Sequence, residues 1–304
     1  MMNNKLPNFL IVGAAKCGTS SLHNYLNQHP DVFMPTFTPE GVKVKEPRFL
    51  IKEKLQKRLP KGIWNYEDYK LLFDSVTNEI AIGESTVLYL YYHNEAIKNI
   101  KKYLGKDVKI IIMLRNPIDR AYSAYLFASR TPQENQTFKK ALINARERFD
   151  KDETLSPMIL YKELGLYYKM VKDYMESFKD VHVILYDDFI LNSDLEVARV
   201  FDFLNIINTN DINTNKIINS GGKKWNSKCM KKLIMREAGV KKILKMLLPK
   251  KVRVSIKNWL ISSFTSKSDP INQSIKKELL DYYQKDVHLL EKLINKDLSE
   301  WMKI

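Results

Sequence analysis

The chain has 304 residues and carries 50 lysines and arginines against 35 aspartates and glutamates, a formal net charge of +15. This length is enough to bury the core of one large domain or of two small ones. The excess of positive charge predicts an anionic partner, which could be a nucleic acid, a membrane surface or an acidic ligand. The two cysteines, Cys17 and Cys229, exclude a disulfide framework and a cysteine-based metal cluster.

The beginning of the chain contains no signal for secretion. Its apolar stretch is too short for a signal peptide, and no window reaches about 18 uninterrupted apolar residues. We therefore expect a cytoplasmic protein without a membrane-spanning helix.

Short apolar runs alternate along the chain with segments of helical spacing. In chain order, the patterns predict a strand at 8–13, a helix at 19–28, a strand at 79–83, a helix at 93–104, a strand at 108–114, a helix that begins at Pro117 after an Asn116 cap, a helix at 161–178 and a strand at 181–186. Strands separated by helices favour a parallel sheet with right-handed crossovers. The prediction is an α/β fold of three layers, with a central parallel sheet flanked by helices and one domain over residues 1–304.

A glycine-rich turn follows the first predicted strand. In the stretch GAAKCGTS, Gly13 and Gly18 keep the spacing of a nucleotide-binding P-loop, but Thr19 stands where that loop has its lysine, and Lys16 comes two residues before Gly18. The loop amides and the helix N-terminus still favour an anion, whereas the lysine that meets a magnesium-bound triphosphate is missing. The alternative is a tight turn with a solvated lysine.

A second polar group follows the predicted strand at 108–114. In LRNPIDRAYSAY, Arg115 ends the strand and Ser123 lies two turns into the next helix. An arginine fork and a serine hydroxyl could converge on one phosphate. The alternative is a structural arginine followed by an unrelated helix serine.

Together the two stretches resemble the motifs of the sulfotransferase superfamily, which uses 3′-phosphoadenosine 5′-phosphosulfate (PAPS). GAAKCGTSSL is similar to the loop that binds the 5′-phosphosulfate, and LRNPIDRAYSAY is similar to the motif that binds the 3′-phosphate. The resemblance covers roughly residues 7 to 205 and is nearer to the heparan-sulfate and bacterial carbohydrate branch than to the cytosolic phenol and steroid branch. It implies a P-loop-like core and a donor that needs no bound metal.

The resemblance also implies roles for the residues of both motifs. Lys16 would contact the bridge between phosphate and sulfate and stabilise the charge that develops there. The 5′-phosphate would be held by Cys17, Gly18, Thr19 and Ser20, and the 3′-phosphate by Arg115 and Ser123. A secondary hypothesis is that the helix N-terminus lowers the pKa of the Cys17 thiol and makes it oxidisable.

Transfer to a hydroxyl requires a base for the acceptor proton. KVKEPRFL resembles the segment that carries the catalytic glutamate in the carbohydrate branch, and Glu46 is the matching residue. Arg48 would then face the donor sulfate or an anionic acceptor. Glu84, in IGESTVLYL, would orient the acceptor or support Glu46, and His93 is the alternative base.

The last third of the chain is basic. In NSGGKKWNSK, residues 219–228, Lys223 or Lys224 would complete the 3′-phosphate site, although an exposed basic loop fits equally well. The region from Lys223 to Lys257 is interpreted as solvated helices, as a surface for an acidic acceptor, or as an amphipathic helix in peripheral contact with an anionic membrane. We expect the basic helical part at 223–304 to pack on the domain.

These inferences converge on one function and two alternatives. The protein is predicted to transfer a sulfuryl group from PAPS to a hydroxyl of a carbohydrate or glycolipid, with release of 3′-phosphoadenosine 5′-phosphate (PAP). The alternatives are a P-loop nucleotide kinase or triphosphatase, and a basic nucleic-acid or membrane-surface protein with a degenerate loop. No nucleic-acid recognition module is found in the sequence, so we expect no nucleic-acid partner.

Overall fold

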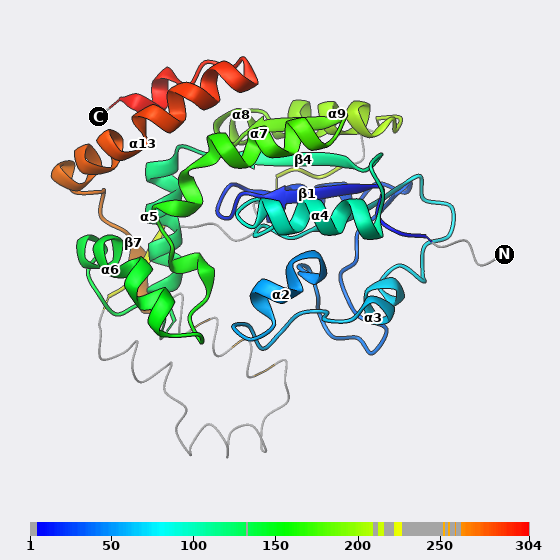
Figure 1. Cartoon of the computed structure of the whole chain (residues 1–304), viewed down its shortest axis with the longest axis horizontal. Coiled ribbons are helices and arrows are strands. Elements are labelled where there is room, and N and C mark those ends of the chain that lie inside the picture. The colour runs from blue at the N-terminus through cyan, green and yellow to red at the C-terminus, as the bar shows by residue number, and fades with distance from the viewer. Residues whose placement is uncertain are drawn as a thin grey trace.

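A five-stranded parallel sheet forms the centre of the protein (Figure 1). The computed structural model describes residues 5–131, 133–208, 212–215, 222–226 and 263–303, together with Val252, Ser255 and Trp259. The strands are β1 (Phe9–Gly13), β2 (Val32–Phe33), β3 (Ala81–Ser85), β4 (Lys109–Leu114) and β5 (Val181–Leu185), in the order β2-β3-β1-β4-β5. Every pairing is parallel. The predicted fold class is confirmed.

Helices cover both faces of this sheet. The main ones are α1 (Thr19–Leu26), α4 (His93–Tyr103), α5 (Pro117–Ala128), α6 (Phe138–Lys151), α7 (Tyr167–Ser177), α8 (Tyr186–Leu191) and α9 (Ser193–Leu204). Helix α1 contacts α9, and α4 contacts α7. Shorter elements are α2 (Lys52–Leu55), α3 (Tyr66–Leu71) and the 3₁₀ turns Phe49–Ile51, Pro157–Ile159, Glu163–Gly165 and Ser299–Met302. Because β1 and β4 are buried between helices, their sequences are almost wholly apolar.

The predicted elements agree with the structure in position, and most differ by a few residues at their ends. The Asn116 cap is confirmed, since its Oδ1 accepts the amide proton of Ile118 at 2.9 Å. The helix predicted from residue 161 begins at Tyr167, because a 3₁₀ turn at Glu163–Gly165 precedes it. Helices α6, α8 and α9 and the two-residue strand β2 were not predicted.

A long helix lies near the end of the chain, within the part at 223–304 that was expected to be helical. Helix α13 (Gln273–Ile294) packs against α7 and α5 and buries Leu279, Tyr283, Val287 and Leu290. In Figure 1 it lies at the end of the molecule opposite the N-terminus. The assignment of the whole chain to one domain stays a prediction.

The basic region at 223–257 lies almost entirely outside the described residues. Its first three residues form strand β6 (Lys223–Trp225), which pairs in antiparallel fashion with β7 (Thr265–Lys267), so these three positions lie in a strand and not in the loop considered as the alternative. The predicted roles of the Lys223 and Lys224 side chains fall outside the part that the structure describes.

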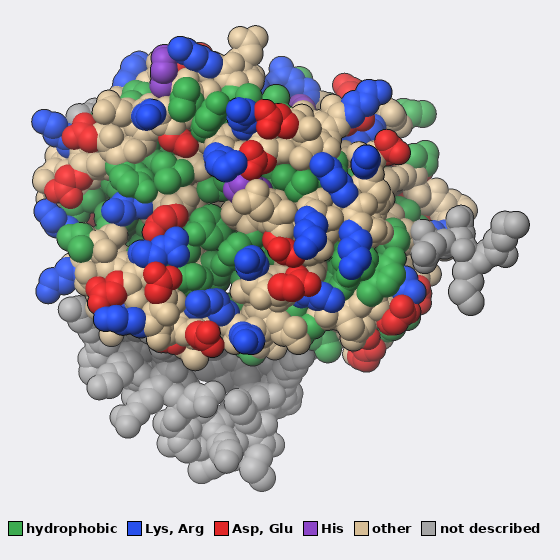
Figure 2. Space-filling view, in the orientation of Figure 1, with side chains coloured by type: hydrophobic (Ala, Val, Ile, Leu, Met, Phe, Trp, Pro, Cys, Tyr) green, Lys and Arg blue, Asp and Glu red, His purple; other side chains and the backbone are tan. Residues whose placement is uncertain are grey.

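The surplus of positive charge is concentrated in this same region. Between residues 223 and 257 the sequence has 13 lysines and arginines and one glutamate, which leaves 37 basic and 34 acidic residues for the rest of the chain. On the face shown in Figure 2, basic and acidic side chains are accordingly interspersed. Within the described ranges, no helix is both long and apolar enough to cross a membrane.

Candidate functional site

A cavity of about 700 Å³ opens at the carboxyl edge of the sheet, where ligands commonly bind in open α/β folds. Most of the residues predicted for the site line it together: Lys16, Gly18, Thr19, Ser20, Glu46, Arg48, Arg115 and Ser123. Cys17, Glu84 and His93 do not line it. The loop after β1, the start of α5 and a segment between β2 and β3 therefore meet at one place.

The loop between β1 and α1 depends on its two glycines. A Cβ on Gly13 would lie 2.6 Å from the Cβ of Leu90, and Gly18 has a φ of 89° with the Tyr186 ring 3.2 Å from where a Cβ would stand. Larger residues would therefore be strained at both positions. Among the described residues, no acceptor pairs with the amides of residues 15–20, whereas the next two amides bond to the Gly18 carbonyl. These free amides at a helix N-terminus form a cradle for an anion.

Lys16 is the cation of this loop. Its Nζ lies 4.5 Å from the centre of the Phe127 ring. Burial, with further contributions from the charges of Arg130 and Arg115, lowers the pKa of Lys16 to about 8. In the part of the chain that the structure describes, no carboxylate forms an ion pair with any of these three cations. An anion in the cavity would supply the missing negative charge.

Arg115 lines the same cavity together with Ser123. The Arg115 guanidinium stacks on Tyr186, 4.6 Å from the ring centre, and its Nε is buried without a hydrogen-bond partner among the described residues. The Asn116 cap starts α5 directly after Arg115, so that Ser123 comes two turns later and lines the same cavity. Tyr186 was missed by sequence reasoning because an aromatic residue after a strand is no distinctive signal.

Cys17 lies in the loop but faces the protein interior. Its side chain is fully buried, and its Sγ lies 3.7 Å from the Ala15 carbonyl oxygen and 4.0 Å from the Tyr167 hydroxyl. Burial raises the pKa of the Cys17 thiol to about 11. The hypothesis of an activated, oxidisable thiol is wrong, because desolvation outweighs the helix N-terminus and the nearby arginines.

Glu46 is held at the cavity wall between two cations. Its carboxylate lies 3.6 Å from Lys45 Nζ and 3.7 Å from Arg48 Nη2. Burial lowers the pKa of Lys45, and the charge of Glu46 opposes this shift. Arg48 is fixed in turn, since its amide donates to Thr86 Oγ1 at 3.2 Å and its Nη1 donates to the Lys61 carbonyl at 2.7 Å. The carboxylate therefore has a defined position facing the cavity.

Glu84 lies behind this segment and is fully buried. It accepts hydrogen bonds from the hydroxyls of Tyr69 at 2.6 Å and Thr86 at 2.7 Å. Burial raises the pKa of Glu84 to about 7, although these hydrogen bonds oppose the shift. Since Thr86 also accepts the amide of Arg48, the position of Glu84 suits a role in supporting Glu46 and not a contact with the acceptor.

His93, the alternative base, is separate from the cavity. It is the first residue of α4, and its Nδ1 lies 2.8 Å from an oxygen of Asp173 on α7. Burial lowers the pKa of this imidazole even though Asp173 opposes the shift. This geometry is typical of a polar contact between packed helices.

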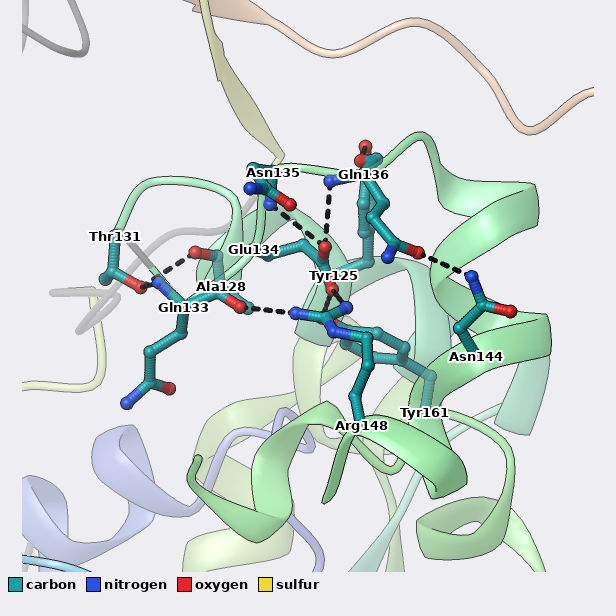
Figure 3. A network of polar contacts seen from close by, with 10 residues as sticks. All are labelled: Tyr125, Ala128, Thr131, Gln133, Glu134, Asn135, Gln136, Asn144, Arg148 and Tyr161. Atoms are coloured by element: carbon teal, nitrogen blue, oxygen red, sulfur yellow. Dashed lines mark hydrogen bonds and ion pairs between the residues drawn. The ribbon is translucent and has the colours of Figure 1, made fainter. Parts of the chain in front are cut away.

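A buried carboxylate organises the loop between α5 and α6 (Figure 3). Oε1 of Glu134 accepts the amide protons of Asn135 at 3.0 Å and Gln136 at 2.9 Å. Its Oε2 accepts from Arg148 Nη1 and from the Tyr161 hydroxyl, both at 2.8 Å. Four hydrogen bonds from three different segments therefore fix this loop to α6 and to the residues before α7.

The same loop supplies two residues of the cavity wall that sequence reasoning missed, Thr131 and Gln133. The backbone amide of Gln133 donates to Thr131 Oγ1 at 3.3 Å, and the backbone carbonyl of Gln133 accepts from Arg148 Nη2 at 2.7 Å. In Figure 3 the Gln133 side chain points away from the network. The side-chain amide of Gln133 is therefore available to a ligand. No motif in the sequence indicates that this residue lines the cavity.

The fold and the cavity define a P-loop-like α/β protein with two anion-binding elements at one site. Residues 6–267 match the family model described as the sulfotransferase domain. The chain belongs to this family, and the predicted resemblance is confirmed. Among the described residues, no group of three or more His, Cys, Asp and Glu is arranged to hold a metal ion.

Relatives of the chain are found among carbohydrate-modifying enzymes. It is 26% identical over 253 residues to carbohydrate sulfotransferase 15 of Mus musculus, an alignment that covers 66% of this chain and 44% of that protein. It is 32% identical over 122 residues to the bifunctional heparan sulfate N-deacetylase/N-sulfotransferase 2 of Homo sapiens, covering 40% of this chain and 13% of that protein. The chain thus spans less than half the length of these relatives.

A solved structure resembles nearly the whole chain. The sulfotransferase from Alicyclobacillus acidocaldarius superposes with a TM-score of 0.70 at 29% sequence identity, over 98% of this chain and 100% of that one. The superposed part of the chain therefore includes the sheet and the C-terminal helix.

The network of Figure 3 leads to a prediction about stability. Replacing Arg148→Met leaves the buried Glu134 carboxylate without its cation and should lower the free energy of unfolding by about 3–5 kcal/mol. The double variant Glu134→Gln/Arg148→Met should lower the free energy of unfolding by less than Arg148→Met alone, because it no longer buries an uncompensated charge. Urea denaturation measures both.

Arg146 provides a matched control on the same helix. Its ion pairs with Asp150 and Glu163 are half-exposed, at 3.4 and 3.6 Å, so Arg146→Met should cost no more than about 1 kcal/mol. An equal decrease in the free energy of unfolding in the Arg146 and Arg148 variants would contradict the stabilising role of the buried network.

Proposed function

We propose that this protein transfers a sulfuryl group from PAPS to a hydroxyl group of a carbohydrate acceptor and releases PAP. The observation that carries this proposal is the single cavity that joins the Lys16 loop to Arg115 and Ser123. PAPS has an anionic group at each end of its ribose, so it requires two separate sets of donors. A nucleoside triphosphate would leave Arg115 and Ser123 without a phosphate.

The chain's own residues would divide the donor between them. The free amides of residues 15–20 and the hydroxyls of Thr19 and Ser20 would hold the 5′-phosphate. Arg115 would form charge-assisted hydrogen bonds with the 3′-phosphate, to which Ser123 adds a neutral donor. Tyr186, which stacks on Arg115, limits the movement of the guanidinium.

Transfer then needs a proton acceptor and a stabilised leaving group. The acceptor oxygen forms a bond to sulfur while the bond between sulfur and the bridging oxygen of the 5′-phosphate breaks. Glu46 takes the hydroxyl proton. Lys16 stabilises the negative charge that develops on the departing phosphate.

The acceptor is proposed to be a glycan or a glycolipid. The named activities of the relatives support this class, and so do two polar groups that line the cavity, the Gln133 side-chain amide and Arg48, which could bind hydroxyl or acidic groups. The cytoplasmic location and the peripheral contact with an anionic membrane rest on the sequence and stay predictions.

Nucleotide calorimetry tests the proposed donor. We expect PAP to bind without magnesium and at least about tenfold more tightly than ATP, because only PAP fills the site of Arg115 and Ser123. Tighter, magnesium-dependent binding of ATP would favour a kinase or triphosphatase instead. Binding of neither nucleotide would favour a non-enzymatic basic protein.

The role of Glu46 is tested by turnover. Glu46→Gln keeps the size of the side chain but removes the base, so kcat should fall by about 10² to 10⁴ while PAP affinity stays within about twofold. Turnover is measured with labelled PAPS and a panel of glycan, glycolipid and phenol acceptors. His93→Gln is the control and should retain most activity. Retained activity in the Glu46 variant would direct attention to His93.

The lowered pKa of Lys16 predicts a pH dependence of PAP binding. An anion favours protonated Lys16, so affinity should be constant up to about pH 7 and should fall, by up to about tenfold per pH unit, above the free-protein pKa of about 8. Lys16→Arg carries a charge that does not titrate in this range, and its affinity should stay flat. Dissociation constants between pH 7 and 9.5 measure both. The same slope in both proteins would contradict the assignment.

A further inference from the structure

The C-terminal segment contacts residues that adjoin the donor-binding elements. The Asp286 carboxylate on α13 accepts the amide proton of Tyr167 at 2.7 Å, at the start of α7. In the following 3₁₀ turn, the Trp301 carbonyl accepts from Asn116 Nδ2 at 3.3 Å, and Trp301 Nε1 donates to Asp187 at 3.2 Å. Asn116 and Asp187 directly follow Arg115 and Tyr186, which line the cavity.

Tyr167 connects this support to both anion-binding segments. Its side chain is fully buried, and its hydroxyl donates to the Arg115 carbonyl at 3.0 Å. The same hydroxyl oxygen lies 4.0 Å from Cys17 Sγ in the Lys16 loop. The Tyr167 ring packs edge-on against Trp301, with 6.3 Å between ring centres. One side chain of α7 thus contacts both segments and the C-terminal turn.

A link at this position matters because the sheet ends just before it. The ladder between β1 and β4 ends at the pair Gly13 and Ile112, and the Ala14 amide then donates to the Met113 carbonyl at 2.7 Å. Beyond that bond the two chains separate into the Lys16 loop and the start of α5. The spacing of the two anion pockets is therefore set by contacts outside the sheet.

We propose that Tyr167, held in place by Asp286 of α13, is a positioning residue that sets the spacing between the pocket for the 5′-phosphosulfate and the pocket for the 3′-phosphate. This inference rests on the proposed function. It assigns a role to a helix that lies beyond residues 6–267, the range matched by the family model. A ligand with one phosphate needs only one pocket, whereas PAP needs both at the correct distance.

The test compares three nucleotides by calorimetry: PAP, adenosine 5′-phosphate and adenosine 3′-phosphate. Tyr167→Phe removes the hydroxyl and keeps the ring. PAP affinity should fall by about tenfold, the effect expected from one buried hydrogen bond, whereas both monophosphates should bind within about twofold of the wild-type protein. A general loosening of the fold would weaken all three ligands by a similar factor.

Tyr174 provides a matched control on the same helix. It is also fully buried, and its hydroxyl donates to the Tyr89 carbonyl at 2.9 Å. Tyr174→Phe should lower the melting temperature about as much as Tyr167→Phe does, but PAP affinity should stay within about twofold. The stability cost of losing a buried hydroxyl is thereby separated from the effect on spacing.

If Tyr167→Phe does not fold, Asp286→Asn serves instead, because it retains the hydroxyl and weakens only the cap of α7. PAP affinity should then fall by about threefold, with the monophosphates unchanged. Unchanged PAP binding in the folded variant, or an equal loss for all three nucleotides, would overturn the positioning role while leaving the proposed function intact. A wild-type protein that binds PAP no more tightly than the monophosphates would overturn the proposed function itself.

Discussion

The site depends on positive charge that the protein leaves without a partner. Lys16, Arg115 and Arg130 lie close enough for the two arginine charges to lower the pKa of the lysine, and no carboxylate of the described residues pairs with any of them. Bringing such charges together in a partly desolvated cavity is unfavourable in the empty protein. A bound polyanion relieves this repulsion, so the same arrangement that costs stability provides affinity for an anionic ligand.

Two carboxylates close to the cavity are held in opposite environments, and this difference separates their roles. Glu46 lies between Lys45 and Arg48 at the cavity wall, whereas Glu84 is enclosed by hydroxyl groups, and burial raises its pKa to about 7. Only the first lines the cavity. The second supports it through Thr86 and the amide of Arg48. Packing thus places one carboxylate at the cavity wall and encloses the other.

Rigid supports surround the cavity on more than one side. The Glu134 network fixes the loop that carries Thr131 and Gln133 (Figure 3), and Asp286 of α13 holds the backbone of Tyr167 at the start of α7. Transfer reactions without covalent intermediates depend on the placement of groups before the reaction begins. Buried polar contacts of Glu134 and Tyr167 hold two of the segments that border the cavity.

The sequence by itself determined the parallel α/β fold and the residues of the two anion-binding motifs, because short apolar strands, loop glycines and a capped helix are local signals. It misjudged Cys17, whose burial depends on the packing of Tyr167 against the loop. It also gave no sign of Gln133, Tyr186 or the contact between Asp286 and Tyr167, which joins residues 119 positions apart. Which side chains face the cavity, and which support it from behind, was decided only by tertiary packing, since desolvation and distance arise from segments that are remote in the chain.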